Sequence, residues 1–348
     1  MSNTRGFACA LLAALSFGAA TPASKPLVES LGPVALAGLL YLGAALGALP
    51  FALGGDGLRA IERLDRRNAL RLAGAIVLGG VIGPLLLLAA LERSSAASVS
   101  LASGLEGPLT AVLGALLFRD ALGRLGWIAV GLASLSGALL AGGDDRTAFA
   151  PTLMVAAACV AWALDNHLTA LLDGVVPAAA TFAKGLAAGL ANLAMALLLD
   201  ARAFGSSEVA AALAVGALGY GLSITLYVTA AQQIGATRAQ TVFAAAPFLG
   251  ALVSFAALGE PLAAVQVLAA LLLASAIALL MKSAHEHVHA HEAFEHVHAH
   301  RHDDGHHGHA HPDMASRVRH SHRHAHEPVV HSHPHQPDLH HRHPHRGR

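Results

Sequence analysis

Ten apolar segments, each close to the length that crosses a lipid bilayer, constrain this chain more than any other feature of its sequence. A membrane-spanning helix needs about 20 apolar residues, whereas strands are shorter and often alternate in polarity. Bilayer hydrocarbon offers backbone groups no water, so these Ala-, Leu- and Gly-rich segments are expected to be helices. They lie near residues 5–24, 31–53, 68–90, 95–118, 124–142, 150–172, 177–199, 209–231, 237–258 and 261–281. The sequence therefore predicts an all-α integral membrane protein with ten transmembrane helices.

The segments form two degenerate copies of one unit, offset by about 140 residues. The aligned positions are Ser95-Ala96 with Gly235-Ala236, Glu106-Gly107 with Ala246-Pro247, Leu109 with Leu249, and Asp120 with Glu260. Each copy holds five helices, and an odd number inverts the second copy relative to the first. Inverted repeats are common in secondary transporters, whose substrate site lies near the membrane midplane between the copies.

This repeat divides the chain into three parts. We expect a first five-helix repeat at 1–143, a second at 144–282, and a disordered His-rich tail at 283–348.

Basic residues between the segments predict the orientation. Ten of them belong to the side that holds the N-terminus: Arg5, Arg59, Arg63, Arg66, Arg67, Arg71, Arg119, Arg124, Arg238 and Lys282. Four belong to the other side: Lys25, Arg93, Arg146 and Arg202. Cytoplasmic loops carry the excess of Lys and Arg, so both termini are expected in the cytoplasm, with the chain in the cell inner (plasma) membrane. The basic stretch at 56–71 is interpreted as a topology determinant, and no nucleic-acid partner is expected.

Several features of the apolar segments have structural interpretations. Cys9 and Cys159 are interpreted as small core residues, not as a disulfide. Gly43 and Gly47 match Gly-x-x-x-Gly, but chance supplies such matches in a Gly-rich chain. The first segment ends in GAATPAS, as a cleaved signal peptide can, yet the repeat requires that segment as a helix.

Glu106 is the first candidate functional residue, because it lies near the middle of a membrane segment. A carboxylate at that depth is costly unless it is paired, protonated or beside water, and intramembrane acids are often functional. We interpret Glu106 as a proton-coupling or substrate-contacting group; a buried structural acid is the alternative. Gly107, Pro108 and Pro247 predict helix kinks at matching depths, since Pro removes a backbone donor and clashes with the preceding turn. Simple curvature without a transport role is the alternative there.

A second group of candidates lies in the sixth and seventh segments. Asp165 and Lys184 are nearly equidistant from the turn that joins the two segments, so at 1.5 Å per residue they reach a similar depth. We predict that they form a buried ion pair, which serves either transport or packing and register. Trp162 and Asn166 flank Asp165 as further candidates, with packing as the alternative for Trp162.

Weaker candidates are polar groups within apolar helices, which often join helices by hydrogen bonds. Tyr220 and Tyr227 are included as substrate-contact candidates, and Asn192, Ser223 and Thr225 are similar in character. Lys25 is interpreted as extending its charged group toward the outer membrane surface. No catalytic group and no nucleotide-binding P-loop pattern is found, so neither an enzyme activity nor a required cofactor is expected.

The tail repeats His-x-His from residue 285 onward. Neutral imidazole is a common ligand of transition metals, so the tail is expected to bind Ni, Zn, Co or Cu. Incidental affinity of a solvated segment is the alternative to a metal buffer or sensor. The candidate ligands are His285, His287, His289, His291, His296, His298, His300, His302, His320, His322, His324 and His326.

The membrane part, about residues 5–282, resembles the EamA-type family of the drug/metabolite transporter superfamily. The resemblance is carried by the two five-helix halves, Leu105-Glu106-Gly107, Ala246-Pro247-Phe248 and the Trp162-to-Asn166 stretch. Two features depart from the family pattern: Gly107 separates Glu106 from Pro108, and Phe17-Gly18 replaces Trp-Gly. The His-rich tail lies outside the resemblance.

The resemblance implies a ten-helix carrier that exports small organic metabolites or drugs by alternating access, without ATP. The expected partners of the carrier are a small-molecule solute and the lipid bilayer. Divalent metal ions are expected separately, at the His-rich tail. Two alternatives remain open at this point. One is a divalent-metal (Ni, Co or Zn) exporter that collects its ion with the tail; the other is a membrane-anchored metal-storage or sensing protein.

Overall fold

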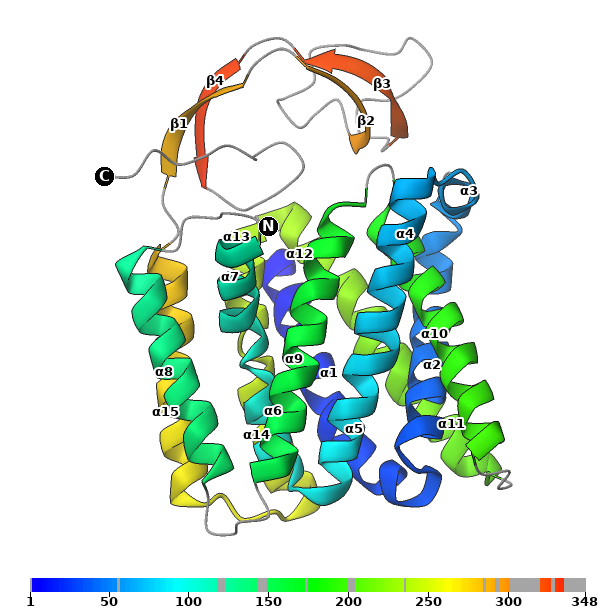
Figure 1. Cartoon of the computed structure of the whole chain (residues 1–348), viewed down its shortest axis with the longest axis vertical. Coiled ribbons are helices and arrows are strands. Elements are labelled where there is room, and N and C mark those ends of the chain that lie inside the picture. Colours follow the sequence, from blue (N-terminus) through cyan, green and yellow to red (C-terminus); the bar gives the residue numbers. More distant parts are fainter. Residues whose placement is uncertain are drawn as a thin grey trace.

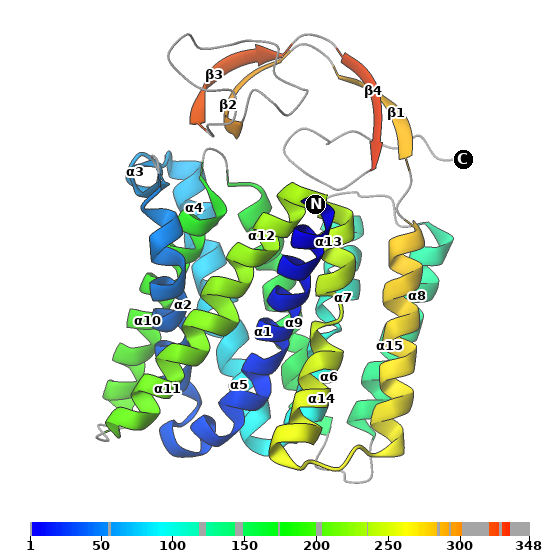
Figure 2. The same cartoon turned by 180° about the vertical axis from the view of Figure 1, so that it is seen from behind.

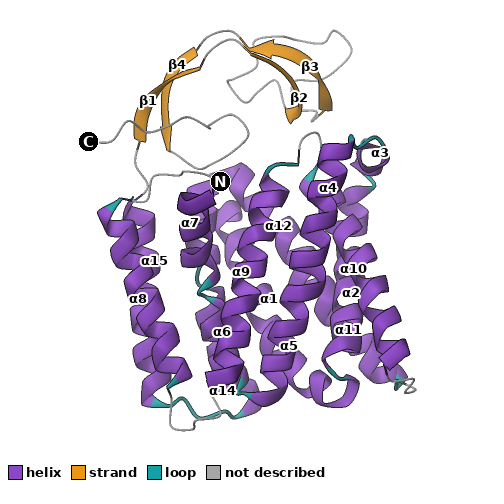
Figure 3. Cartoon of the chain, viewed as in Figure 1, coloured by secondary structure: helices purple, strands orange, loops and turns teal. Residues whose placement is uncertain are grey.

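The structure, a computed structural model, describes the chain in eleven stretches. These are residues 2–54, 57–117, 123–142, 149–172, 175–199, 204–234, 236–283, 286–291, 294–300, 320–326 and 329–334. Side chains are described over the same stretches except at 2, 3, 232, 236, 237 and from 283 onward. Figure 3 colours these residues by secondary structure and leaves the others grey.

Ten helices of the described residues are long and apolar enough to cross a membrane, which confirms the predicted number. The first half comprises α1 (Ser2–Leu31), α2 (Pro33–Ala52), the short α3 (Gly57–Glu62), α4 (Arg66–Ala75), η1 (Ile76–Ile82), α5 (Gly83–Arg93), α6 (Ala96–Ser103), α7 (Glu106–Leu117) and α8 (Arg124–Ala141). The second half comprises α9 (Phe149–Ala170), α10 (Pro177–Leu199), α11 (Ser206–Gly216), η3 (Ala217–Leu222), α12 (Ser223–Ile234), α13 (Ala236–Phe243), α14 (Ala246–Leu258) and α15 (Ala264–Ser283). The first span differs from its expected length, because α1 continues through Pro22 and Pro26 to Leu31.

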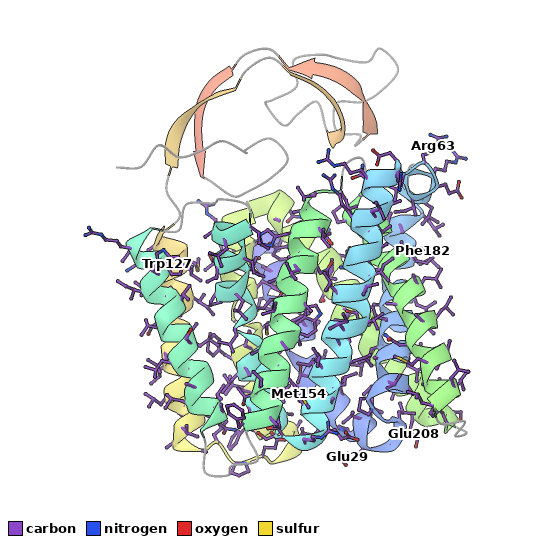
Figure 4. All side chains as sticks on the ribbon, viewed as in Figure 1. Glu29, Arg63, Trp127, Met154, Phe182 and Glu208 are labelled. Carbon is purple, nitrogen blue, oxygen red and sulfur yellow. The ribbon has the colours of Figure 1, made fainter. Side chains whose placement is uncertain are left out.

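The spans form one bundle, and α1 begins at the same end at which α15 finishes (Figure 1). Seen from behind, α2 lies against α10, and α15 against α8 (Figure 2). Charged side chains lie at the two ends: Arg63 is at the end that holds the N-terminus, and Glu29 and Glu208 are at the opposite end (Figure 4). Large apolar side chains such as Leu190 and Leu271 are exposed on the bundle, where lipid would cover them.

The two halves repeat the same helix irregularities. A π-helical turn interrupts the third span at Ile76–Ile82 and the eighth at Ala217–Leu222. The fourth and ninth spans are both broken, between α6 and α7 and between α13 and α14. Each break comes just before a proline, Pro108 or Pro247, whose ring leaves the carbonyl four residues earlier without its usual donor. The breaks lie beside the prolines at which the sequence predicts kinks, at corresponding positions of the two halves.

Glycines let α2 approach the second half backbone to backbone. A Cβ atom on Gly43 would meet the carbonyl oxygen of Leu213, and a Cβ atom on Gly47 would meet that of Ala217. From the other side, a Cβ atom on Gly216 would meet the carbonyl oxygen of Leu40. The Gly-x-x-x-Gly motif at Gly43 and Gly47 is therefore a packing motif and not a chance match. Close contact between helices in a membrane requires small residues.

The parts of the tail that the structure describes are short strands. Four segments are strands: β1 (Glu286–His291), β2 (Phe294–His300), β3 (His320–His326) and β4 (Val329–Pro334). β1 pairs with β4 and β2 with β3, both antiparallel. The physical reason is visible in the sequence, because strict alternation of His with another residue has the period of a strand.

The glycine contacts predict that Gly43→Val destabilises the protein by about 1–3 kcal/mol, since the added atoms would push α2 away from η3. Thermal unfolding of the purified protein in detergent would measure the loss. Gly131→Val is the matched control, because Gly131 is in the middle of α8 and a Cβ atom there would meet nothing within 4 Å. Equal stability of the two variants would contradict this account of the interface.

Candidate functional site

One face of α9 carries a group of polar contacts inside the bundle. Cys159, Trp162, Asp165, Asn166 and Thr169 follow one another at spacings of one or three residues, which places them along one side of a helix. Their partners lie in α6, α7, η1 and α10, and α7 and η1 also pack against α9. Through this face, α9 contacts the irregular third and fourth spans of the first half and also α10 of its own half.

Asp165 and Lys184 form the predicted ion pair. The Lys184 Nζ lies 2.6 Å from Oδ1 and 2.5 Å from Oδ2 of Asp165, and Thr169 donates a hydrogen bond to Oδ1 at 2.9 Å. The Asp165 residue is 5% exposed. The opposite charges make the pair neutral overall, and Thr169 adds a further hydrogen bond to the carboxylate.

The π-helical turn of the third span supplies backbone acceptors to the same region. The Tyr41 hydroxyl and the Trp162 Nε1, at 3.1 Å, both donate to the carbonyl oxygen of Gly79. The Asn192 Nδ2 donates to the carbonyl oxygen of Gly80 at 3.0 Å. A π turn lengthens the hydrogen-bonded ring and exposes such carbonyls, and π turns often mark functional sites.

Gly79 also makes room for the ion pair. A Cβ atom at this position would overlap the carboxylate of Asp165, so only glycine allows α9 and η1 to approach this closely. Tyr41 was not among the sequence candidates, since no pattern reveals that it faces a π turn. It is one of three tyrosines in the chain, and the rarity of that residue is the only signal that could have found it.

Glu106 is the first residue of α7, directly after the break in the fourth span. Its Oε1 accepts a hydrogen bond from Asn166 Nδ2 at 2.7 Å. Within the part of the chain that the structure describes, no salt bridge involves Glu106. Its carboxylate is half-buried and lies at a helix N-terminus, where the helix dipole favours negative charge.

The break itself is held by Cys159, whose thiol lies 3.5 Å from the carbonyl oxygen of Ser103 and 3.8 Å from that of Ala102. On the other side, a Cβ atom on Gly104 would contact the ring of Pro247. The breaks in the two halves therefore lie next to each other.

Aromatic side chains extend from this cluster across the second half. Tyr41 stacks on Tyr220 with ring centroids 6.3 Å apart, and Tyr220 meets Phe17 edge-on at 5.7 Å. Phe17 contacts Phe243 at 5.3 Å, and Phe243 contacts Tyr227 at 5.1 Å. These five residues, the aromatic row, come from α1, α2, η3, α12 and α13, and all five are half-buried. Tyr227 also donates a hydrogen bond to Gln240 Oε1 at 2.7 Å.

A separate polar contact, the outer clamp, lies at the end of the bundle opposite the N-terminus. Glu260 accepts from the backbone amides of Ala96 at 2.8 Å and Ala97 at 2.9 Å, at the start of α6. Lys25 donates to the carbonyl oxygens of Leu91 at 2.7 Å and Ser94 at 3.1 Å, at the end of α5. Each charge complements a helix dipole. Lys25 thus binds a helix end, which differs from the expected extension toward the membrane surface.

The structure brings together five of the sequence candidates: Glu106, Trp162, Asp165, Asn166 and Lys184. Tyr220 and Tyr227 belong to the adjoining aromatic row. A Cβ atom on Gly107 would meet nothing within 4 Å, and Pro108 and Pro247 lie in the first turns of the helices after the breaks.

The tail metal candidates stand apart from this site. His285 and His302 lie outside the described residues, and the side chains of the other tail candidates are not described. Among the side chains that are described, no group of three or more His, Cys, Asp or Glu could hold a metal ion.

Comparison with known proteins gives one family, one similar protein and one solved structure of similar fold. Residues 4–142 and 150–282 each match the model of the EamA-like transporter family. A protein of Methanothermobacter thermautotrophicus, described as an uncharacterized transporter, is 27% identical in an alignment of 308 residues that covers 80% of this chain and 87% of the relative. A solved crystal structure, described only as that of a protein, superposes with a TM-score of 0.57 at 18% identity and covers 80% of this chain and 95% of its own. The last likeness concerns the fold alone.

The ion pair predicts a non-additive mutational cycle. Lys184→Met should destabilise the protein by about 3–5 kcal/mol, because it leaves a buried carboxylate without its partner. Adding Asp165→Asn should recover part of that loss, and unfolding of the purified variants would measure both. Glu29→Gln is the control, since Glu29 is 3.8 Å from Lys25 and 65% exposed, and surface pairs contribute about 0–1 kcal/mol. Additive losses in the cycle would contradict the pairing.

Proposed function

Because the chain belongs to the EamA-like transporter family, we propose that this multi-pass membrane transporter exports small organic solutes by alternating access. The observation that supports the proposal best is the matched pair of irregular spans in the two halves. Both π turns and both helix breaks lie at corresponding positions of the two halves. In the first half, the contacts made by Glu106 and by the residues around Asp165 lie beside the π turn and the break. Irregular backbone at membrane depth is tolerated only where protein or a water-filled cavity surrounds it, and in transporters it marks the substrate site.

The charges of the cluster favour a solute that carries an amine. Asp165 and Lys184 cancel each other, so an ionised Glu106 leaves one uncompensated negative charge among the described groups of the cluster. That charge suits either a cationic group of the solute or a coupling proton. The aromatic row beside it suits an apolar or aromatic part of the same solute, since rings stack on rings and attract cations.

Each residue then has a distinct role. Glu106 binds the amine or the coupling proton, and Asn166 orients its carboxylate. Trp162 and Tyr41 hold the π turn of the third span, while Asp165 and Lys184 keep α9 and α10 in register. None of these roles requires ATP, a cofactor or a covalent reaction with the solute.

The outer clamp supports a carrier that opens and closes at the end opposite the N-terminus. It joins the turn between α5 and α6 in the first half to the loop before α15 in the second, so its release would separate the halves at that end. Basic side chains such as Arg59, Arg63 and Arg66 gather at the other end. The excess of Arg and Lys favours that end, with both termini, on the cytoplasmic side of the inner membrane.

The two alternatives differ from this proposal in what the helices move. A divalent-metal exporter needs ligands for the ion along its path, and the described side chains offer no group of three. A storage or sensing protein would move no solute, although matched irregular spans are an arrangement that alternating access uses.

Glu106→Gln is expected to lower solute transport about tenfold or more, which corresponds to ~1.4 kcal/mol, because the amide keeps the shape and loses the charge. The measurement is proton-gradient-driven uptake of phenylalanine and of the cationic dye ethidium into vesicles that contain the purified protein. Glu92→Gln is the matched control, since Glu92 lies at a helix end, with 39% of its side chain exposed.

Undiminished transport by Glu106→Gln would exclude the coupling role. Uptake of Ni²⁺ in place of both organic probes would favour the metal exporter, and no uptake of any probe would favour a storage or sensing protein.

Glu260→Gln is expected to loosen the outer clamp, because it removes the charge that holds two backbone amides. Hydrogen bonds to a charged group contribute about 1.5–3 kcal/mol, so the open population at this end should rise by about tenfold. The readout is the labelling rate of Ala97→Cys by a membrane-impermeant maleimide in a Cys9→Ala/Cys159→Ser background, since Ala97 is fully buried in the closed clamp. Glu208→Gln, at the same end, is the control, and an unchanged labelling rate in Glu260→Gln would refute the clamp.

A further inference from the structure

The four strands of the tail belong to one hairpin. Both ladders are antiparallel, so the partner's residue number falls by one for each residue along the first arm. The numbering of the partners continues without an offset from the first ladder to the second. Glu286 pairs with Pro334 at the open end, and His300 pairs with His320 next to the connecting segment. β1 and β2 are therefore successive parts of one arm, and β3 and β4 are successive parts of the other.

This register sets histidine opposite histidine. The outer ladder, β1 with β4, contains two such pairs, and the inner ladder, β2 with β3, contains three. The pairs are His287–His333 and His289–His331 in the outer ladder, and His296–His324, His298–His322 and His300–His320 in the inner one. A shift of the register by one residue would pair histidines with Val, Ala, Ser or Arg instead.

The pairs of each ladder share one face. Successive residues of a strand alternate between faces, so positions 296, 298 and 300 lie on the same face as positions 320, 322 and 324. The opposite face of the inner ladder receives Glu295, Val297 and Ala299 with their partners. Histidine is thus confined to one face of each ladder, which chance composition does not require.

We propose that the hairpin binds two divalent transition-metal ions, one in each ladder, through two adjacent histidine pairs. Directly opposite residues have Cβ atoms about 4.5–5.5 Å apart, and neighbouring pairs follow at about 7 Å. Two adjacent pairs place four histidines within that spacing, and four is the number of ligands that a tetrahedral zinc site uses. Zn²⁺, Co²⁺, Ni²⁺ and Cu²⁺ all accept neutral imidazole, so the class of ligand is a first-row divalent metal.

Metal binding and hairpin formation are linked in this proposal. Protonated imidazoles placed directly opposite each other repel and destabilise a ladder, whereas an ion bound between them supplies folding free energy. The tail follows α15 at the bundle end that holds the N-terminus, which is the cytoplasmic end under the proposed orientation (Figure 1). The metal sites stand independently of the solute that the helices carry.

The inner ladder offers a sharp test, because its three pairs are not equivalent. Any two adjacent pairs include the central one, His298–His322. Without it, the remaining pairs are four residues apart, about 13 Å, and cannot share an ion. Removing the terminal pair, His300–His320, leaves two adjacent pairs in place.

The experiment titrates Co²⁺ into the full-length protein in lipid nanodiscs and follows the visible absorption that tetrahedral cobalt shows strongly. The unmodified protein should bind about two ions in this form. His298→Asn/His322→Asn should lower the number to about one, while His300→Asn/His320→Asn should leave it at about two. His306→Asn/His307→Asn removes the same number of histidines from between the two arms and should also leave it unchanged.

Equal losses in the central-pair, terminal-pair and His306/His307 variants would overturn the proposal, because binding would then follow the histidine count of a flexible chain. Absence of tetrahedral absorption in the unmodified protein would overturn it as well. A monodisperse elution profile of each variant shows that the ten-helix part is intact.

Discussion

Backbone groups inside a bilayer have no water to bind, and this constraint shapes the whole membrane part of the molecule. Where the third and fourth spans depart from regular helix, side chains from other spans complete the hydrogen bonding. Tyr41 and Trp162 bind the carbonyl of Gly79, Asn192 binds that of Gly80, and Cys159 lies against the last carbonyls of α6. The irregular turns are therefore stabilised by side chains that reach them from α2, α9 and α10.

The two halves share their backbone and differ in their chemistry. The π turns and the helix breaks occur in both, but the position that corresponds to Glu106 is Ala246. Likewise Lys184 and Asn192 lie in α10, whereas α2 supplies glycines and Tyr41. A symmetric frame allows the two ends to exchange open and closed states, while an asymmetric set of side chains can bind one solute at one place.

Much of this could be predicted residue by residue. Segment length revealed ten spans, and Pro108 and Pro247, one position apart in the alignment of the two copies, indicated the breaks, because proline acts on its own helix. Asp165 and Lys184 were predictable as a pair because both are counted from one turn. The Gly79 acceptor, the partner of Tyr41 and the contacts of Lys25 and Glu260 were not predictable, because each joins residues far apart in the chain. The hairpin register in the tail was missed although the alternation that favours strands was present in the sequence.

The sequence by itself determined the number of spans, their inverted duplication and the depth of Glu106 and the buried ion pair. These properties depend on apolar length, on helix rise and on proline, which act within one segment and need no partner. The tertiary structure alone decided which carbonyls accept side-chain donors, that Gly43 and Gly79 are required for close approach, and that Glu260 holds the start of α6. Those outcomes depend on how helices from different halves are rotated and brought into contact, and local residue preferences do not encode that arrangement.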